Sequence, residues 1–146
     1  MPEPSPIDSA VRDVVLRVLA EYEADVAEVR HEWGERAGMW FTEVEPRRPG
    51  AAPLSLSFDG QDLLNVNIGP TWFEVFPFGG DKESLAYLQG IIRAVMAGRV
   101  EESGSLSASF ARVHTDNGTV NVGDVHAPWP WRWRQVREYQ PYGDHR

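Results

Sequence analysis

Residues 54–78 alternate apolar and polar side chains in three successive runs, and glycine-containing turns separate these runs. The runs cover residues 54–58, 64–68 and 71–78, and residues 40–45 form a similar run before them. Alternation over four to eight residues predicts half-buried strands. Because the connections are short, we expect successive strands to pair antiparallel. This part of the chain therefore predicts an antiparallel sheet.

The Asp59-Gly60 turn constrains the pairing of the first two runs. A two-residue loop would set apolar side chains opposite Asn65, because side-chain direction alternates along a strand. A three-residue loop over residues 58–60 instead places Leu54 opposite Leu64, with Gly60 at the position that requires positive φ. We therefore predict the three-residue loop.

The Gly69-Pro70 turn constrains the third run in the same way. A two-residue turn there places Val66 opposite Phe73 and Leu64 opposite Val75. The remaining side chains would then share the opposite face of the sheet, where amides and a carboxylate beside aromatic rings suit a binding pocket. These residues are Asn65, Asn67, Trp72, Glu74 and Phe76.

Two segments have the spacing of amphipathic helices. Residues 6–33 carry apolar side chains every three or four positions, and Ser5 is a suitable N-cap. The other face of this predicted helix is acidic and includes Glu21, Asp25 and Glu28. The second helix is predicted to follow Asp81 and to end at Gly98.

The last third of the chain again favours strands, over residues 106–113 and around Val120, with Asn117-Gly118 as a hairpin signal. We expect one α+β domain over residues 1–146, with an antiparallel sheet of about six to seven strands and two helices on one face. The predicted order is α-β-β-β-β-α-β-β-(β). Residues 1–5 and 140–146 are expected to fray.

Residues 129–139 are rich in tryptophan and arginine. In a strand, Trp129, Trp131 and Trp133 would share one face and Arg132, Arg134 and Glu138 the other. The tryptophans could pack on the sheet. Alternatively the segment is a binding surface, since Trp and Arg anchor protein interfaces. Aromatic and arginine side chains also suit single-stranded nucleic acid.

Two histidines and two aspartates flank the second hairpin, in the pattern His114-x-Asp116 and Asp124-x-His126. Residues two apart share a strand face, so each pair could supply two ligands to a metal. The predicted turn does not bring the four groups into register, and hydrogen bonding across the strands is the other interpretation. We therefore predict no metal site and no other cofactor.

Catalytic signatures are missing from the sequence. No serine lies in a nucleophile elbow, and no glycine-rich phosphate loop occurs. Glu43 and Glu45 share a strand face and could act as an acid–base pair, although such pairs are commonly solvated. The chain has no cysteine, which excludes disulfides, thiolate metal sites and a cysteine nucleophile.

The net charge of −8 and the pI of about 4.9 disfavour general nucleic-acid binding and anionic membrane surfaces. Without a signal peptide or an apolar run of about 20 residues, the chain is expected in the cytoplasm. The charge suits a basic partner protein or a small ligand.

The leading hypothesis is a non-enzymatic binding protein, of the antitoxin or immunity type, that covers a basic partner with its acidic helix. The alternative is a small-molecule-binding domain or hydrolase with its pocket on the sheet face that bears Trp72 and Phe76. A third possibility is a homodimer that covers this face, because monomers seldom expose a large apolar patch.

Overall fold

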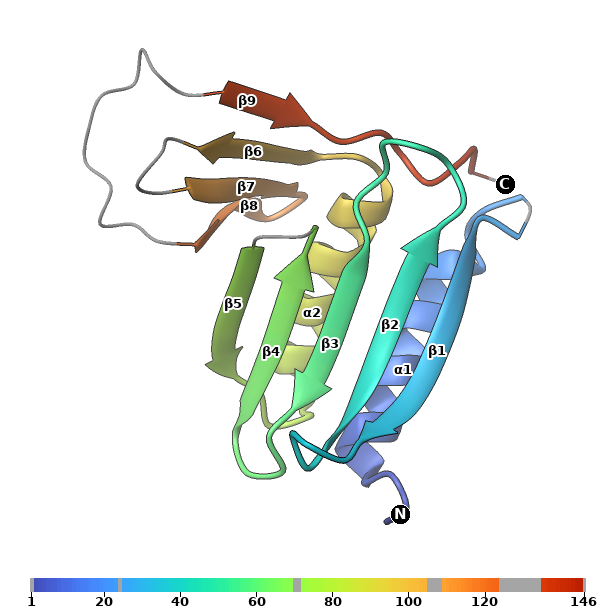
Figure 1. Cartoon of the computed structure of the whole chain (residues 1–146), viewed down its shortest axis with the longest axis vertical. Coiled ribbons are helices and arrows are strands. Elements are labelled where there is room, and N and C mark those ends of the chain that lie inside the picture. Colours follow the sequence, from blue (N-terminus) through green and yellow to red (C-terminus); the bar gives the residue numbers. More distant parts are fainter. Residues whose placement is uncertain (1, 24, 70–71, 105–108, 124–134, 146) are drawn as a thin grey trace.

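The computed structural model describes residues 2–23, 25–69, 72–104, 109–123 and 135–145. In this part of the chain, five antiparallel strands form one sheet, two helices cover one of its faces, and four further strands form a second sheet beyond one end of the helices (Figure 1). The α+β class and the two helices agree with the prediction. The single sheet of six to seven strands was wrong, because the strands divide between two sheets.

The first helix, α1, spans Pro6–Leu19 and is shorter than predicted. Its start is as expected, because Ser5 and Asp8 form a reciprocal capping box: the Ser5 hydroxyl accepts from the Asp8 amide and the Asp8 carboxylate accepts from the Ser5 amide. Ser5, the last residue of the segment that was predicted to fray, is thus part of the helix cap.

Strand β1, Ala27–Gly34, occupies the segment that was predicted to continue the helix. Residues 26–33 fit two periodicities: Val26, Val29 and Trp33 have helical spacing, whereas Val29, His31 and Trp33 alternate as in a strand. Strand β2, Met39–Pro46, decides between them by pairing with β1 along its whole length. This ladder sets Val29 opposite Val44, which a continuous helix could not do.

Strands β3 (Leu54–Phe58) and β4 (Leu63–Ile68) are joined by a longer connection than predicted. Leu54 pairs with Ile68, and the predicted partner Leu64 pairs with Phe58. The carboxylate of Asp59 closes the loop by accepting from the backbone amides of residues 61, 62 and 63 at 2.8, 3.0 and 3.1 Å. Gly60 has φ +88°, as expected. The register differs by an even number of residues, so apolar side chains still face one another.

Strand β5, Trp72–Pro77, pairs with β4 one residue away from the predicted register. Leu64 lies opposite Phe76, and Asn65 lies opposite Val75. A shift of one residue exchanges the two faces of a strand. Phe76 is therefore 9% exposed beneath the helices, whereas Val75 is 40% exposed on the other face. This register buries the larger apolar side chain, which is the more favourable arrangement.

The helix α2, Lys82–Met96, lies beside α1 on the covered face of the sheet (Figure 1). Its buried side chains include Leu88, Ile91, Ile92 and Val95, each 0% exposed. They meet the inward side chains of β3 and β4, such as Leu56, Leu64, Val66 and Ile68. The opposite face of the sheet has no helix against it in the described part of the chain.

The second sheet contains β6 (Val100–Gly104), β7 (Ser109–Thr115), β8 (Gly118–Gly123) and β9 (Gln135–Glu138), in the order β8-β7-β6-β9. Strand β6 was not predicted. A helix of 15 residues carries the chain about 22 Å along its axis. Strand β6 begins only four residues after α2 ends, so it lies beyond that end of the helix. There, β6 to β9 form a separate sheet.

Residues 140–145, which belong to the segment that was predicted to fray, include side chains that pack against the core. Tyr142 is 2% exposed, and its hydroxyl donates to the carbonyl oxygen of Ala52 at 2.6 Å. Its backbone amide donates to the carbonyl of Met96 at 2.7 Å, which fixes the end of α2. His145 stacks on Tyr22 with ring centroids 4.5 Å apart.

Candidate binding surfaces

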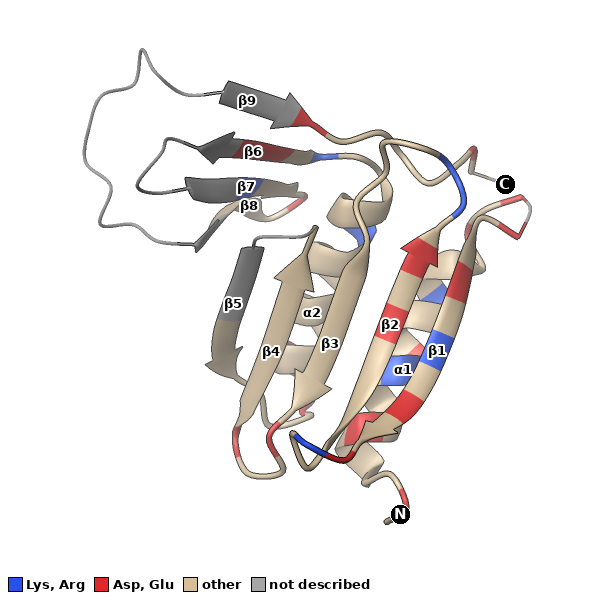
Figure 2. Cartoon of the chain, viewed as in Figure 1, with Lys and Arg blue, Asp and Glu red and all other residues tan. Residues whose placement is uncertain are grey.

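The uncovered face of the five-stranded sheet is acidic over its first two strands (Figure 2). The outward positions of β1 and β2 carry four glutamates and one arginine, which together we call the acidic sheet face: Glu28, Arg30, Glu32, Glu43 and Glu45. Alternation along each strand places these side chains on the face away from the helices. The face thus presents a net charge of −3.

The charges on the acidic sheet face are only partly compensated. Arg30 forms an ion pair with Glu43, with 2.9 Å between the guanidinium Nη2 and the carboxylate Oε2. Glu28 lies directly opposite Glu45 in the ladder. Like charges in this position destabilise a sheet. Neither carboxylate has a cationic partner among the described residues.

The predicted acidic helix surface does not form, because α1 ends at Leu19. Glu21 follows α1 and pairs with Arg93 at 3.1 Å, whereas Asp25 lies in the connection to β1 and pairs with Arg47 at 2.8 Å. Only Glu28 belongs to the acidic sheet face. The physical reason is that residues 27–34 form a strand, so these three acids cannot share a helix face.

The predicted pocket residues are also divided between two faces. Asn65 and Asn67 lie on the uncovered face, where Asn65 Nδ2 is 3.3 Å from the hydroxyl of Ser57 and Asn67 borders a shallow hollow of about 120 Å³. Phe76 is buried on the other face. Trp72 and Glu74 pair with Ile68 and Val66 in the ladder, and their side chains lie outside the described part of the structure.

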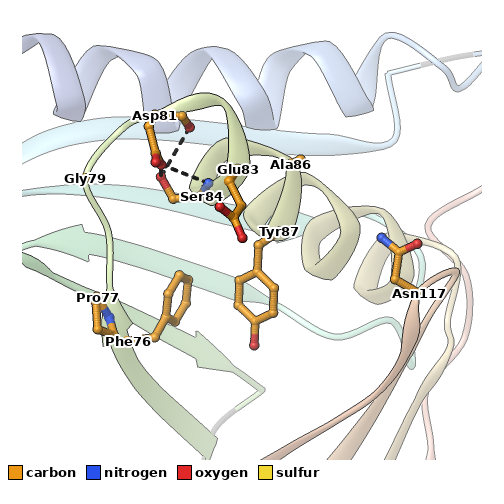
Figure 3. Close-up of a pocket in the computed structure, with 9 residues that line it drawn as sticks. All are labelled: Phe76, Pro77, Gly79, Asp81, Glu83, Ser84, Ala86, Tyr87 and Asn117. Atoms are coloured by element: carbon orange, nitrogen blue, oxygen red, sulfur yellow. Dashed lines mark hydrogen bonds between the residues drawn. The ribbon is translucent and has the colours of Figure 1, made fainter.

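A larger pocket, of about 710 Å³, lies between the end of β5, the first turns of α2 and the β7–β8 turn (Figure 3). The rings of Phe76 and Tyr87 meet there edge to face, with centroids 5.1 Å apart. Tyr87 is 41% exposed, and Asn117 lies on the far side of it (Figure 3). Sequence reasoning placed Phe76 in a pocket but missed Tyr87 and Asn117, because the pocket joins segments that are far apart in the chain.

Two carboxylates border this pocket. Asp81 is the N-cap of α2 and accepts from the backbone amide of Ser84 at 3.0 Å. The hydrogen bonds from the Ser84 hydroxyl and amide hold the pKa of Asp81 below its usual range, so that this group stays ionised. Glu83 is exposed and has no hydrogen-bond or ion-pair partner in the described ranges.

A polar and aromatic cluster lies between α1 and the first two strands. His31 stacks on Trp40, with centroids 4.8 Å apart, and its Nδ1 is 3.0 Å from the Thr42 hydroxyl. Burial, and secondarily the charge of Arg12, lowers the pKa of His31. The Nε2 of His31 and the Nε1 of Trp40 are buried and have no partner among the described residues.

The predicted metal-ligand candidates are engaged in other interactions where the structure describes them. His114 Nε2 lies 3.2 Å from the Glu101 carboxylate, and its Nδ1 lies 3.2 Å from the Thr119 hydroxyl. The Asp116 carboxylate forms an ion pair with the Arg99 guanidinium at 2.9 Å. The hairpin register sets His114 opposite Thr119. No group of three or more His, Asp or Glu side chains that could hold a metal occurs in the described ranges. Asp124 and His126 lie outside them.

The tryptophan and arginine segment also falls outside the described ranges, and with it the predicted binding residues Trp131, Arg132, Trp133 and Arg134. Within residues 129–139, which were considered as an optional last strand, Gln135–Glu138 form β9. It lies at the edge of the second sheet beside β6.

Neither α1 nor α2 is long and apolar enough to cross a bilayer. Comparisons of the chain with protein-family models, with curated proteins and with solved structures found no match.

Proposed function

We propose that this chain is a non-enzymatic binding protein that attaches to a basic partner protein through the acidic sheet face. The observation that carries the proposal is the position of Glu28 directly opposite Glu45 on a sheet face that no described element covers. Like-charged neighbours cost folding stability, and a cationic partner would relieve their repulsion.

The whole molecule and this face have the same sign of charge. The net charge of −8 speeds the approach of a basic partner, and the acidic sheet face would then orient it. Partly buried serine and asparagine side chains continue the surface across β3 and β4, at Ser55, Asn65 and Asn67. Such groups can exchange hydrogen bonds with a partner. A neutraliser of a basic toxin, of the antitoxin or immunity type, is one form that such a protein takes.

The homodimer hypothesis has less support than the sequence alone gave it. The homodimer hypothesis counted Phe76 among the apolar side chains of the uncovered face, but Phe76 is buried under α2 and Val75, 40% exposed, lies on that face instead. The acidic sheet face is unsuited to pairing with a second copy of itself, because its excess charge would meet the same excess charge.

The test is capture from a lysate of the source organism by the tagged protein at low and high salt, read by mass spectrometry. The wild type should retain a stoichiometric basic protein at low salt and release it at high salt. The variant Glu28→Lys/Glu32→Lys/Glu45→Lys should not retain it. The matched control Asp13→Lys/Glu23→Lys/Asp62→Lys, whose three acids lie off this face, brings the net charge to the same −2 from −8.

The control variant should retain the partner, because its acidic sheet face is intact. Equal loss from both variants would show that net charge alone holds the partner and would contradict the proposal. Capture that is indifferent to all six substitutions would contradict it as well.

A further inference from the structure

The pocket of about 710 Å³ beside α2 plays no part in the proposed attachment to a partner. Its volume falls within the range of about 300–1,000 Å³ that is usual for small-molecule sites. Three elements that are distant in sequence form it: the end of β5, the start of α2 and the β7–β8 turn (Figure 3). It therefore offers more than the amide groups of a single helix end.

One wall of the pocket is aromatic. Tyr87 packs edge to face against Phe76, yet it remains 41% exposed, while its neighbour Leu88 is 0% exposed. Its ring lies between Phe76 and Asn117 in Figure 3. An accessible aromatic face carries negative π density and attracts a cation within about 6 Å of the ring centre.

The charged groups among the residues that line the pocket are both acidic. Asp81 is occupied with capping α2, whereas Glu83 makes no hydrogen bond or ion pair to any described residue. The amino end of a helix carries only about half a positive charge. Two carboxylates exceed this charge, so the pocket is negative overall.

We propose that this pocket binds a small organic cation, an ammonium or guanidinium group on an apolar stem. The cationic group pairs with the Glu83 carboxylate beside the Tyr87 ring, and the stem continues along the wall that Tyr87 and Phe76 form. Asn117 offers an amide to a polar group at the other end of the ligand. The proposal is independent of the acidic sheet face, which lies on the other side of the sheet from α2.

The test is a titration of the ¹⁵N-labelled protein with benzylammonium, followed by amide chemical shifts. Saturable shifts should concentrate at residues 79–87 and 117. Benzyl alcohol has the same shape without the charge and should bind about tenfold more weakly, since it loses both the ion pair and the cation–π attraction. Benzoate should not bind.

The cationic group could belong to a side chain of a partner protein or to a free metabolite, and the capped peptide acetyl-Gly-Arg-Gly-amide distinguishes these two sources. Tighter binding of the peptide than of benzylammonium assigns the pocket to a partner's side chain. Tighter binding of benzylammonium assigns it to a metabolite.

Two variants locate the site. Glu83→Gln should weaken benzylammonium binding about three- to fivefold, and Tyr87→Leu about threefold. Glu35→Gln removes an exposed acid in the β1–β2 turn and should leave the binding unchanged. If Glu83 served only to start α2, Glu83→Gln would lower the stability of the protein without changing the affinity of the folded protein for benzylammonium.

The proposal is overturned if benzyl alcohol binds as tightly as benzylammonium, because the pocket would then be only an apolar hollow. It is also overturned if the shifts spread over the acidic sheet face, or if Glu83→Gln binds like the wild type. Since Glu83 is exposed and unpartnered in the described structure, this variant should fold even where Tyr87→Leu does not.

Discussion

The two faces of the five-stranded sheet use the same strands in opposite ways. On the covered face, Leu54, Leu56 and Val66 are 2%, 1% and 0% exposed against the helices. On the other face, one residue away along the same strands, Ser55 and Asn67 are only partly buried. The covered face determines the fold, because burial of apolar surface dominates folding free energy. The described side chains of the uncovered face bury less apolar surface, so we expect substitutions there to change stability less.

The strongest test of this comparison substitutes neighbouring residues of β3. Leu56→Ala should lower the free energy of unfolding by about 2–5 kcal/mol, because it leaves a cavity in the core. Ser55→Ala should change it by less than about 0.5 kcal/mol, as is usual for surface substitutions. Urea denaturation measures both. Comparable losses from the two variants would show that the uncovered face is packed against something.

The next test removes a polar group from the core. Tyr142→Phe leaves the ring in place but deletes the donor to the carbonyl of Ala52, which is 0% exposed. The buried carbonyl then lacks a partner, so the free energy of unfolding should fall by about 1–3 kcal/mol. Asn65→Ala removes a long 3.3 Å hydrogen bond on the uncovered face and should cost less, about 0.5 kcal/mol. Thermal and urea unfolding distinguish the two.

A pH titration examines the polar cluster on the covered face. The pKa of His31 is lowered, chiefly by burial, while Arg12, Asp8 and Asp13 are the charged groups that act on it from α1. The unfolded chain then binds a proton more readily than the folded protein. Stability should be complete above the unfolded pKa of about 6.5 and should fall as the pH drops below it.

The variant His31→Gln should flatten this decline between pH 7.5 and pH 5. The resulting change in the free energy of unfolding should be smaller than the loss caused by Tyr142→Phe. His145→Gln is the control, and it should keep the decline of the wild type. If His31→Gln unfolds with the pH dependence of the wild type, other groups are responsible for the acid sensitivity.

The parts of the fold that local patterns determine were predictable. Ser5 caps α1, Asp81 caps α2, and the alternating runs form β2 to β5. The register of β5 was not predictable, because burial of Phe76 under α2 decides it and this contact is tertiary. The same holds for β1, whose residues suit a helix until β2 pairs with them.

The candidate surfaces were predictable only in part. Alternation showed that Glu43 and Glu45 share a strand face, but the assignment of Glu28 to a helix concealed that it lies opposite Glu45. The pocket beside α2 depends on Tyr87 meeting Phe76 and on the hairpin that brings Asn117 near. No local pattern indicates such a meeting of distant segments.

The smallest expected effect bears most directly on why the two faces differ. Glu28→Gln removes the repulsion from Glu45 and should raise the free energy of unfolding by a few tenths of a kcal/mol at low salt, with the gain disappearing as salt screens the charges. The same change should weaken attachment to the proposed basic partner. Glu35→Gln, in the β1–β2 turn, should change neither quantity. A gain in stability together with a loss of binding is what a surface kept acidic for a partner requires, since functional sites commonly reduce stability. If Glu28→Gln lowered stability instead, the carboxylate would serve the fold, and the acidic sheet face would lose its functional argument.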